Sequence, residues 1–159
     1  MSENATQTRI SRCGFSLVEL VIVVIVIGIL SAIAVPKYMD HVRKTKERSQ
    51  QIKLMMLRDA IERYVIEHDR IFPSATTEDV FKSEIMDYLA SDFPTLDFSH
   101  GKLPENYDPS GVLVVNSDNV FNGETTPTKA WKYNSTNGKI IVNLSWPTSL
   151  DPTVNYDDW

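Results

Sequence analysis

Glu19 is the ionisable residue that most needs an explanation, because it lies inside the apolar run from Phe15 to Val35. An ionised carboxylate at the centre of a bilayer costs about 2.5 to 3.5 kcal/mol on insertion scales. Polar groups inside such a segment therefore need either a partner or a path to water. This makes Glu19 the first candidate functional residue of the chain.

Three acids near the C-terminus are the candidate metal ligands. Asp151, Asp157 and Asp158 carry carboxylate oxygens of the kind that calcium prefers. An acidic tail is more commonly a solvated surface, so we expect no resident cofactor. Calcium at these three residues is the alternative.

No catalytic arrangement is recognisable in the sequence. His41, His68 and His100 have neither the spacing of metal ligands nor that of a catalytic group, and there is no nucleophile motif or phosphate-binding loop. The net charge of −5 argues against nucleic acid as a partner. With Cys13 as its one cysteine, the chain forms no internal disulfide. We expect a protein that is not an enzyme.

The N-terminal region divides into a polar leader and a membrane-length helix. Residues 1–14 are polar, carry Arg9 and Arg12, and show no periodicity, so we exclude them from the fold. The 21 residues that follow would form a helix about 31 Å long, which is close to the thickness of the hydrocarbon core. We predict a leader over 1–14, a transmembrane helix over 15–36 and a globular domain over 37–159.

Apolar residues recur at spacings of three and four beyond Pro36, which predicts an amphipathic helix over about 37–69. Its charged first part, residues 37–51, is expected to be solvated or to lie at a membrane surface. We expect one long helix that is kinked at Pro36. The residues of the apolar face are Leu54, Leu57, Ile61, Tyr64, Val65 and His68, with Ile52, Met55 and Met56 widening it.

The rest of the globular domain contains a short helix followed by strands. Residues 76–91 form the predicted helix, which Thr76 or Thr77 can cap. Strands are predicted over 111–116, 129–134 and 139–145, and the Asn-Gly pair between the last two favours a hairpin. The fold class is α+β, with the long helix packed on a small antiparallel sheet.

The stretch GFSLVEL, residues 14–20, resembles the prepilin processing motif: a glycine, an aromatic residue, and a glutamate four residues further on. Gly28 and Pro36 stand where type IV pilins and type II secretion pseudopilins usually carry these residues. The short basic leader is similar as well. The order of long helix and then sheet resembles the same class over the whole chain.

This resemblance implies that a prepilin peptidase cuts between Gly14 and Phe15 and that the new amino group of Phe15 is N-methylated. Glu19 would neutralise this ammonium, in its own or a neighbouring subunit, and would thereby set the axial register of an incoming subunit. Gly28 and Pro36 would permit close helix packing and local melting, or would simply make a single span flexible.

The resemblance also implies a location and partners. The mature chain would cross the inner membrane once, in contact with lipid and with its globular domain in the periplasm. An inner-membrane assembly platform would then add it to a helical filament of its own copies or related pilins. Lysines and arginines are more numerous after the span than before it, which favours the opposite orientation. The processing motif is the more specific signal, and we follow it.

Three alternatives stay open. A mature chain without cysteine lacks the disulfide of several type IV pilins, which favours a pseudopilin or a minor or atypical pilin. Ala32-Ile33-Ala34 is similar to a conventional signal-peptide cleavage site, which would make this a secreted domain that starts at Val35. An enzyme held by a plain membrane anchor is the third.

Overall fold

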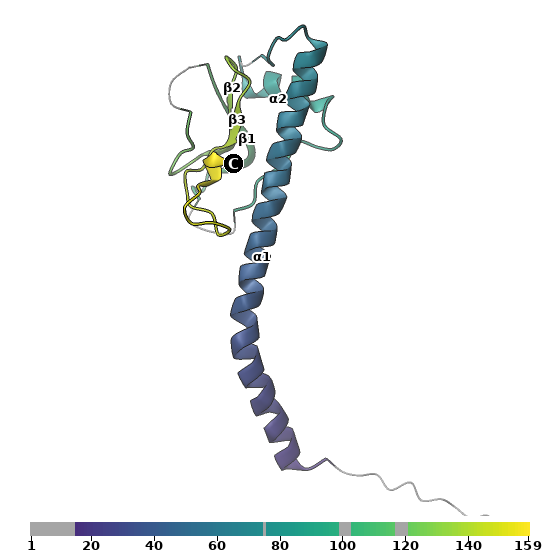
Figure 1. The fold of residues 1–159 in the computed structure, drawn as a ribbon, viewed down its shortest axis with the longest axis vertical. Helices are drawn as coiled ribbons and strands as arrows, with labels where there is room; N and C mark the ends of the chain where they lie inside the picture. Colours follow the sequence, from purple (N-terminus) through teal and green to yellow (C-terminus); the bar gives the residue numbers. More distant parts are fainter. Residues whose placement is uncertain (1–14, 75, 99–102, 117–120) are drawn as a thin grey trace, which may run out of the picture. The chain divides into compact units, whose positions relative to one another are not determined.

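The computed structural model describes residues 15–74, 76–98, 103–116 and 121–159 (Figure 1). The chain divides into two compact units, Met1–Met39 and Asp40–Trp159. The leader with Arg9, Arg12, Cys13 and Gly14 lies outside the described residues, as does His100.

Helix α1 spans Leu17–Glu67 and contributes to both units. The helix continues through Pro36, although proline removes one hydrogen bond inside a helix. The kink expected at Pro36 stays a prediction. The helix ends where Asp69 and Arg70 adopt positive φ angles of 51° and 66°.

The second unit confirms the predicted amphipathic face of α1. Leu54, Leu57, Ile61 and Tyr64 are buried in the core cluster. These positions follow each other at spacings of three and four, so they share the side of the helix that packs on the globular domain.

The buried face of α1 is narrower than predicted, so this part of the prediction was wrong. Ile52, Met55 and Met56 remain 58%, 65% and 37% exposed. At about 100° per residue, Ile52 and Met55 lie on the opposite side of the helix from Leu54 and Leu57. His68 lies beyond the end of α1 and is also exposed.

The prediction that residues 37–51 are solvated was wrong at two positions. Glu47 and Gln50 are buried, with 3% of each residue exposed. They lie seven and four residues before Leu54 and therefore extend the buried face of α1 toward its N-terminal end.

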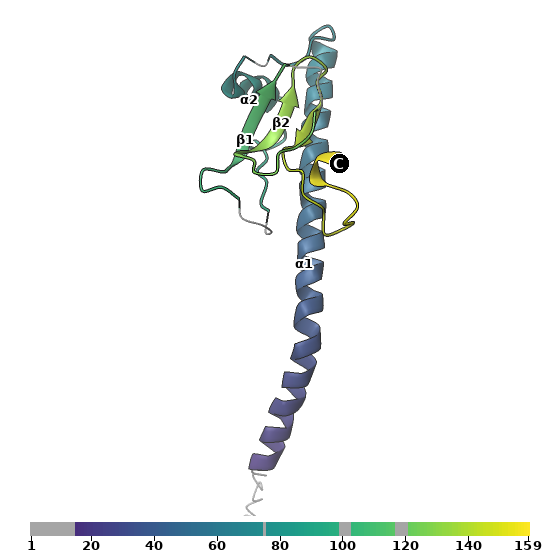
Figure 2. The same ribbon diagram turned by 90° about the vertical axis from the view of Figure 1, so that its left-hand side faces the viewer.

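The sheet has the strand order β1-β2-β3, with β1 at Asp108–Val115, β2 at Lys129–Asn134 and β3 at Ile140–Val142 (Figure 2). Strands β2 and β3 form the predicted antiparallel hairpin. Strands β1 and β2 are parallel, so the sheet is mixed, and the prediction of an antiparallel sheet was wrong. Residues 116–128 are long enough to bring the chain back to the starting end of β1, which a parallel pair requires.

Helix α2, Glu78–Met86, is the predicted short helix. Its N-cap is Thr77, whose hydroxyl accepts a hydrogen bond from the Val80 N–H at 3.3 Å. Phe81 and Ile85 are the buried residues of this helix. A short 3-10 helix, Tyr156–Asp158, lies near the C-terminus.

The core joins α1, α2 and the sheet around two large aromatic side chains. Trp131 and Tyr133, both on β2, are fully buried. The Trp131 indole N–H donates to the carbonyl of Pro94 at 3.0 Å, and the Tyr133 hydroxyl donates to the carbonyl of Pro73 at 3.2 Å. Both polar atoms are thereby satisfied, as buried polar atoms need to be.

Gly138, in the turn between β2 and β3, is required both by its backbone conformation and by its surroundings. Its φ is +70°, and a Cβ there would lie 2.4 Å from Cδ1 of Phe72. We expect Gly138→Ala to lower the free energy of unfolding by about 2–4 kcal/mol, because strain at positive φ and overpacking add. Urea unfolding followed by tryptophan fluorescence measures this. Thr136→Ala, at an exposed position of the same turn, is the control, and equal midpoints for the two variants would contradict the prediction.

Candidate assembly interface

The first unit presents an apolar helical surface that its own chain does not cover. Phe15 is 74% exposed, and the Leu, Ile and Val side chains from Leu17 to Val35 are 44% to 78% exposed. This part of α1 is long and apolar enough to cross a membrane. An exposed apolar surface of this extent is typical of a site that binds lipid or protein.

Glu19 lies in the first turn of α1. A negative charge at this end of a helix is favourable, because the N-terminal end carries partial positive charge. Within residues 15–74, 76–98, 103–116 and 121–159, its carboxylate has no ion-pair or hydrogen-bond partner. Phe15 lies four residues before Glu19 and two before the start of α1, so these two predicted site residues lie at the same end of the helix.

Gly28 and Pro36 lie further along α1 and are both exposed. A Cβ built at Gly28 meets no atom within 4 Å, so the folding of this chain does not require a glycine there. A residue without a side chain leaves the helix surface open to close approach by another helix.

The three C-terminal acids each bind different backbone groups. Asp151 accepts hydrogen bonds from the Thr153 N–H and hydroxyl at 2.9 and 2.7 Å, and these bonds lower the pKa of Asp151. Asp157 accepts from the Gly123 N–H at 2.7 Å, and Asp158 from the Asn155 N–H at 3.0 Å. Among the described residues, no three acids, histidines or cysteines gather into a metal site. Calcium binding at these acids stays an untested alternative.

Sequence reasoning missed Glu47, which holds the C-terminal segment on α1. Its carboxylate accepts hydrogen bonds from the Ser149 N–H at 2.8 and 3.0 Å, the Leu150 N–H at 3.0 Å and the Tyr156 hydroxyl at 2.6 Å. Burial alone would raise the pKa of Glu47, but these bonds favour the charged form and outweigh it, so the pKa is lowered. The same burial raises the pKa of Tyr156.

Arg58 makes a second attachment between α1 and the C-terminal residues. Its guanidinium donates to the carbonyls of Trp159 at 2.6 Å and Ile140 at 3.3 Å. Pro147 and Asn155 pair as an antiparallel bridge, which closes the segment between them into a loop. These hydrogen bonds fasten the C-terminal segment without a disulfide.

The sequence carried one signal for the burial of Glu47, which is its spacing of seven residues from Leu54 on the buried face of α1.

Comparisons with known proteins match the N-terminal part of the chain. Residues 9–35 match the family described as "Prokaryotic N-terminal methylation motif". A fimbrial protein of Pseudomonas aeruginosa is 42% identical over 66 residues, which cover 42% of this chain and 43% of that protein. A type IV major pilin protein of Myxococcus xanthus is 40% identical over 57 residues, covering 36% of this chain and 26% of that protein.

A type IV major pilin protein of Neisseria gonorrhoeae shares a longer region. It is 30% identical over 105 residues, which are 66% of this chain and 44% of that protein. The chain thus spans less than half of the length of these curated relatives. No solved structure matches it.

Proposed function

We propose that this chain, which belongs to the type IV pilin family by its N-terminal segment, is a structural subunit that polymerises into a type IV pilus. The observation that carries the proposal is the exposed apolar helix with one acid, Glu19, in its first turn. Such a surface must be covered by lipid before assembly and by other helices after assembly.

The proposed maturation begins with a prepilin peptidase, which hydrolyses the peptide bond between Gly14 and Phe15. The α-amino group of Phe15 that this releases is then N-methylated and stays cationic at neutral pH. A cation at the edge of an apolar helix is costly in lipid. The Glu19 carboxylate of a neighbouring subunit offsets that cost once two helices pack side by side.

The proposed location follows from the same helix. Residues 15–36 anchor the chain in the inner membrane, residues 37–159 lie in the periplasm, and an assembly platform transfers the subunit from lipid into the filament. Gly28 permits close approach between helices at that stage, and Pro36, at the end of the span, permits local melting of the helix.

A pilus is favoured over a secretion pseudopilus by the relatives named above, which are described as fimbrial or type IV pilin proteins. Their structural role also supports a subunit that is not an enzyme. The C-terminal attachment through Glu47 and Arg58 supplies the closure that a disulfide would otherwise provide, so the missing cysteine is compatible with a pilin.

Mass spectrometry of the native chain tests the proposed maturation. We expect its N-terminal peptide to begin at Phe15 with one added methyl group. Gly14→Val should leave residues 1–14 attached, since a branched side chain would obstruct cleavage after this position. The matched control is Cys13→Val, which adds a similar side chain one residue earlier and should be processed normally.

A native chain that begins at Val35 would instead identify a conventional signal peptide. A chain that retains residues 1–14 would contradict processing altogether.

A further inference from the structure

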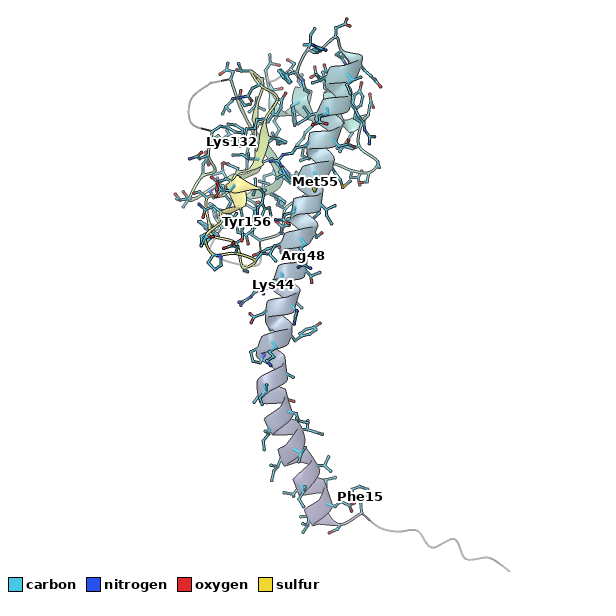
Figure 3. All side chains as sticks on the ribbon, viewed as in Figure 1. Phe15, Lys44, Arg48, Met55, Lys132 and Tyr156 are labelled. Atoms are coloured by element: carbon cyan, nitrogen blue, oxygen red, sulfur yellow. The ribbon has the colours of Figure 1, made fainter. Side chains whose placement is uncertain are left out.

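The side of α1 that faces away from the core carries an ordered set of charges in the second unit. Lys44 and Arg48 come first along the helix, Met55 lies in the middle, and Asp59 and Glu62 follow. Their spacings of four, seven, four and three place all five within about 60° of the helix circumference. All five are exposed, and Figure 3 shows Lys44, Arg48 and Met55 in this order along α1.

Little within the chain neutralises these charges. In the described part of the chain, Lys44, Arg48 and Glu62 have no ion-pair partner. Asp59 pairs with Arg63 at 2.5 Å, but both side chains are more than half exposed, so the pair is solvated and weak. This exposed face of α1, from Lys44 to Glu62, is therefore basic at one end and acidic at the other.

We propose that the exposed face of α1 between Lys44 and Glu62 is a self-complementary docking face, on which the basic end of one copy binds the acidic end of a second, parallel copy. The parallel orientation rests on the proposed function, because subunits that pack through one N-terminal helix all point the same way.

The two charge pairs require nearly the same displacement between copies. Lys44 and Asp59 are 15 residues apart, and Arg48 and Glu62 are 14 apart. At 1.5 Å per residue, one axial shift of about 21–23 Å brings Lys44 opposite the partner's Asp59 and Arg48 opposite the partner's Glu62. Because a single shift forms both ion pairs, a second copy of this chain fits the face as its binding partner.

Apolar side chains on the same face supply contact area between the charged ends. Ile52 and Met55 are 58% and 65% exposed, although they lie on the helix that forms the core. Apolar contact strengthens the neighbouring ion pairs by excluding water from them. The charges in turn select the axial offset of this pair of copies, because a displacement of 11 or 18 residues would form one ion pair instead of two. This second copy is a different neighbour from the one whose Glu19 meets Phe15, since that contact requires a shift of only about 6 Å between the two helices.

Charge reversal in the full-length chain tests the docking face. Lys44→Glu with Arg48→Glu makes both ends acidic, and Asp59→Lys with Glu62→Lys makes both ends basic. We expect each double variant to reduce the yield of sheared filaments at least about tenfold while its amount in the membrane stays normal. The quadruple variant, which exchanges the two ends, should restore filaments. The matched control, Lys132→Glu on β2 with Lys139→Glu immediately before β3, should assemble like wild type.

Each outcome decides the proposal. Normal filaments from both double variants, or a quadruple variant that assembles no better than the doubles, would overturn it. A third outcome is that only the variant Lys44→Glu with Arg48→Glu is lost, and that it is lost from the membrane as well as from filaments. This would identify an anionic lipid surface as the partner of the basic end and would also overturn the proposal. A wild-type chain that forms no filaments would refute the proposed function itself, which separates the two failures.

Discussion

Glu19→Val should reach the membrane in normal amounts but lose nearly all of its filaments. Valine fits the apolar segment better than an acid does, so insertion is not impaired. The variant leaves the Phe15 ammonium without its counter-charge when helices pack, and loss of one partner from a buried pair costs about 3–5 kcal/mol. At 1.4 kcal/mol per factor of ten, we expect at least a roughly hundredfold loss of sheared filaments.

The matched control for this variant is Ser31→Val, which also replaces a polar residue by valine within the exposed apolar segment. It should assemble as wild type does. Membrane fractionation and immunoblotting of sheared filaments measure both steps. Normal filaments from Glu19→Val would show that the carboxylate has no part in assembly.

Glu47→Ala should lower the free energy of unfolding by about 2–4 kcal/mol, since the Ser149, Leu150 and Tyr156 donors lose a buried charged acceptor. Chemical denaturation of the detergent-solubilised full chain measures the change. Glu62→Ala, at an exposed position of the same helix, is the control and should change stability by less than about 0.5 kcal/mol. Equal stabilities for the two variants would contradict the role of Glu47.

The Glu47 effect should depend on pH in a defined direction. The folded chain holds the pKa of Glu47 below its ordinary value of 4.5. Its stabilising contribution is therefore fully present above that value and disappears as the pH falls through the lowered pKa of the folded state. The stability difference between wild type and Glu47→Ala should be constant near neutral pH and shrink in acid. A difference that grows in acid would refute this assignment.

Most of the helical architecture could be predicted because its signals are local. The apolar run from Phe15 to Val35 predicted the first part of α1, and the spacing of Leu54, Leu57 and Ile61 predicted the buried face. Thr76 and Thr77 were the two candidate caps of α2, and Thr77 is the cap in the structure. The β2–β3 hairpin followed from the turn residues between the two strands. Each of these signals lies within the element that it predicts.

Features that depend on distant residues could not be predicted. Glu47 lies among lysines and arginines and resembles a solvated residue, yet its burial depends on donors 102 to 109 positions later. The direction of β1 relative to β2 depends on the path of residues 116–128 and not on the composition of either strand. Met55 seemed to widen the core face because apolar spacing alone does not tell a core contact from a surface available to another chain.

A reconstruction of the native filament at side-chain resolution would show how the subunits pack. We expect the Phe15–Val35 helices to pack against one another inside the filament, with a Glu19 carboxylate within about 4 Å of a Phe15 amino nitrogen of a neighbouring subunit. Helices that stay apart, or a Glu19 carboxylate that faces solvent far from any Phe15 nitrogen, would contradict the proposed assembly.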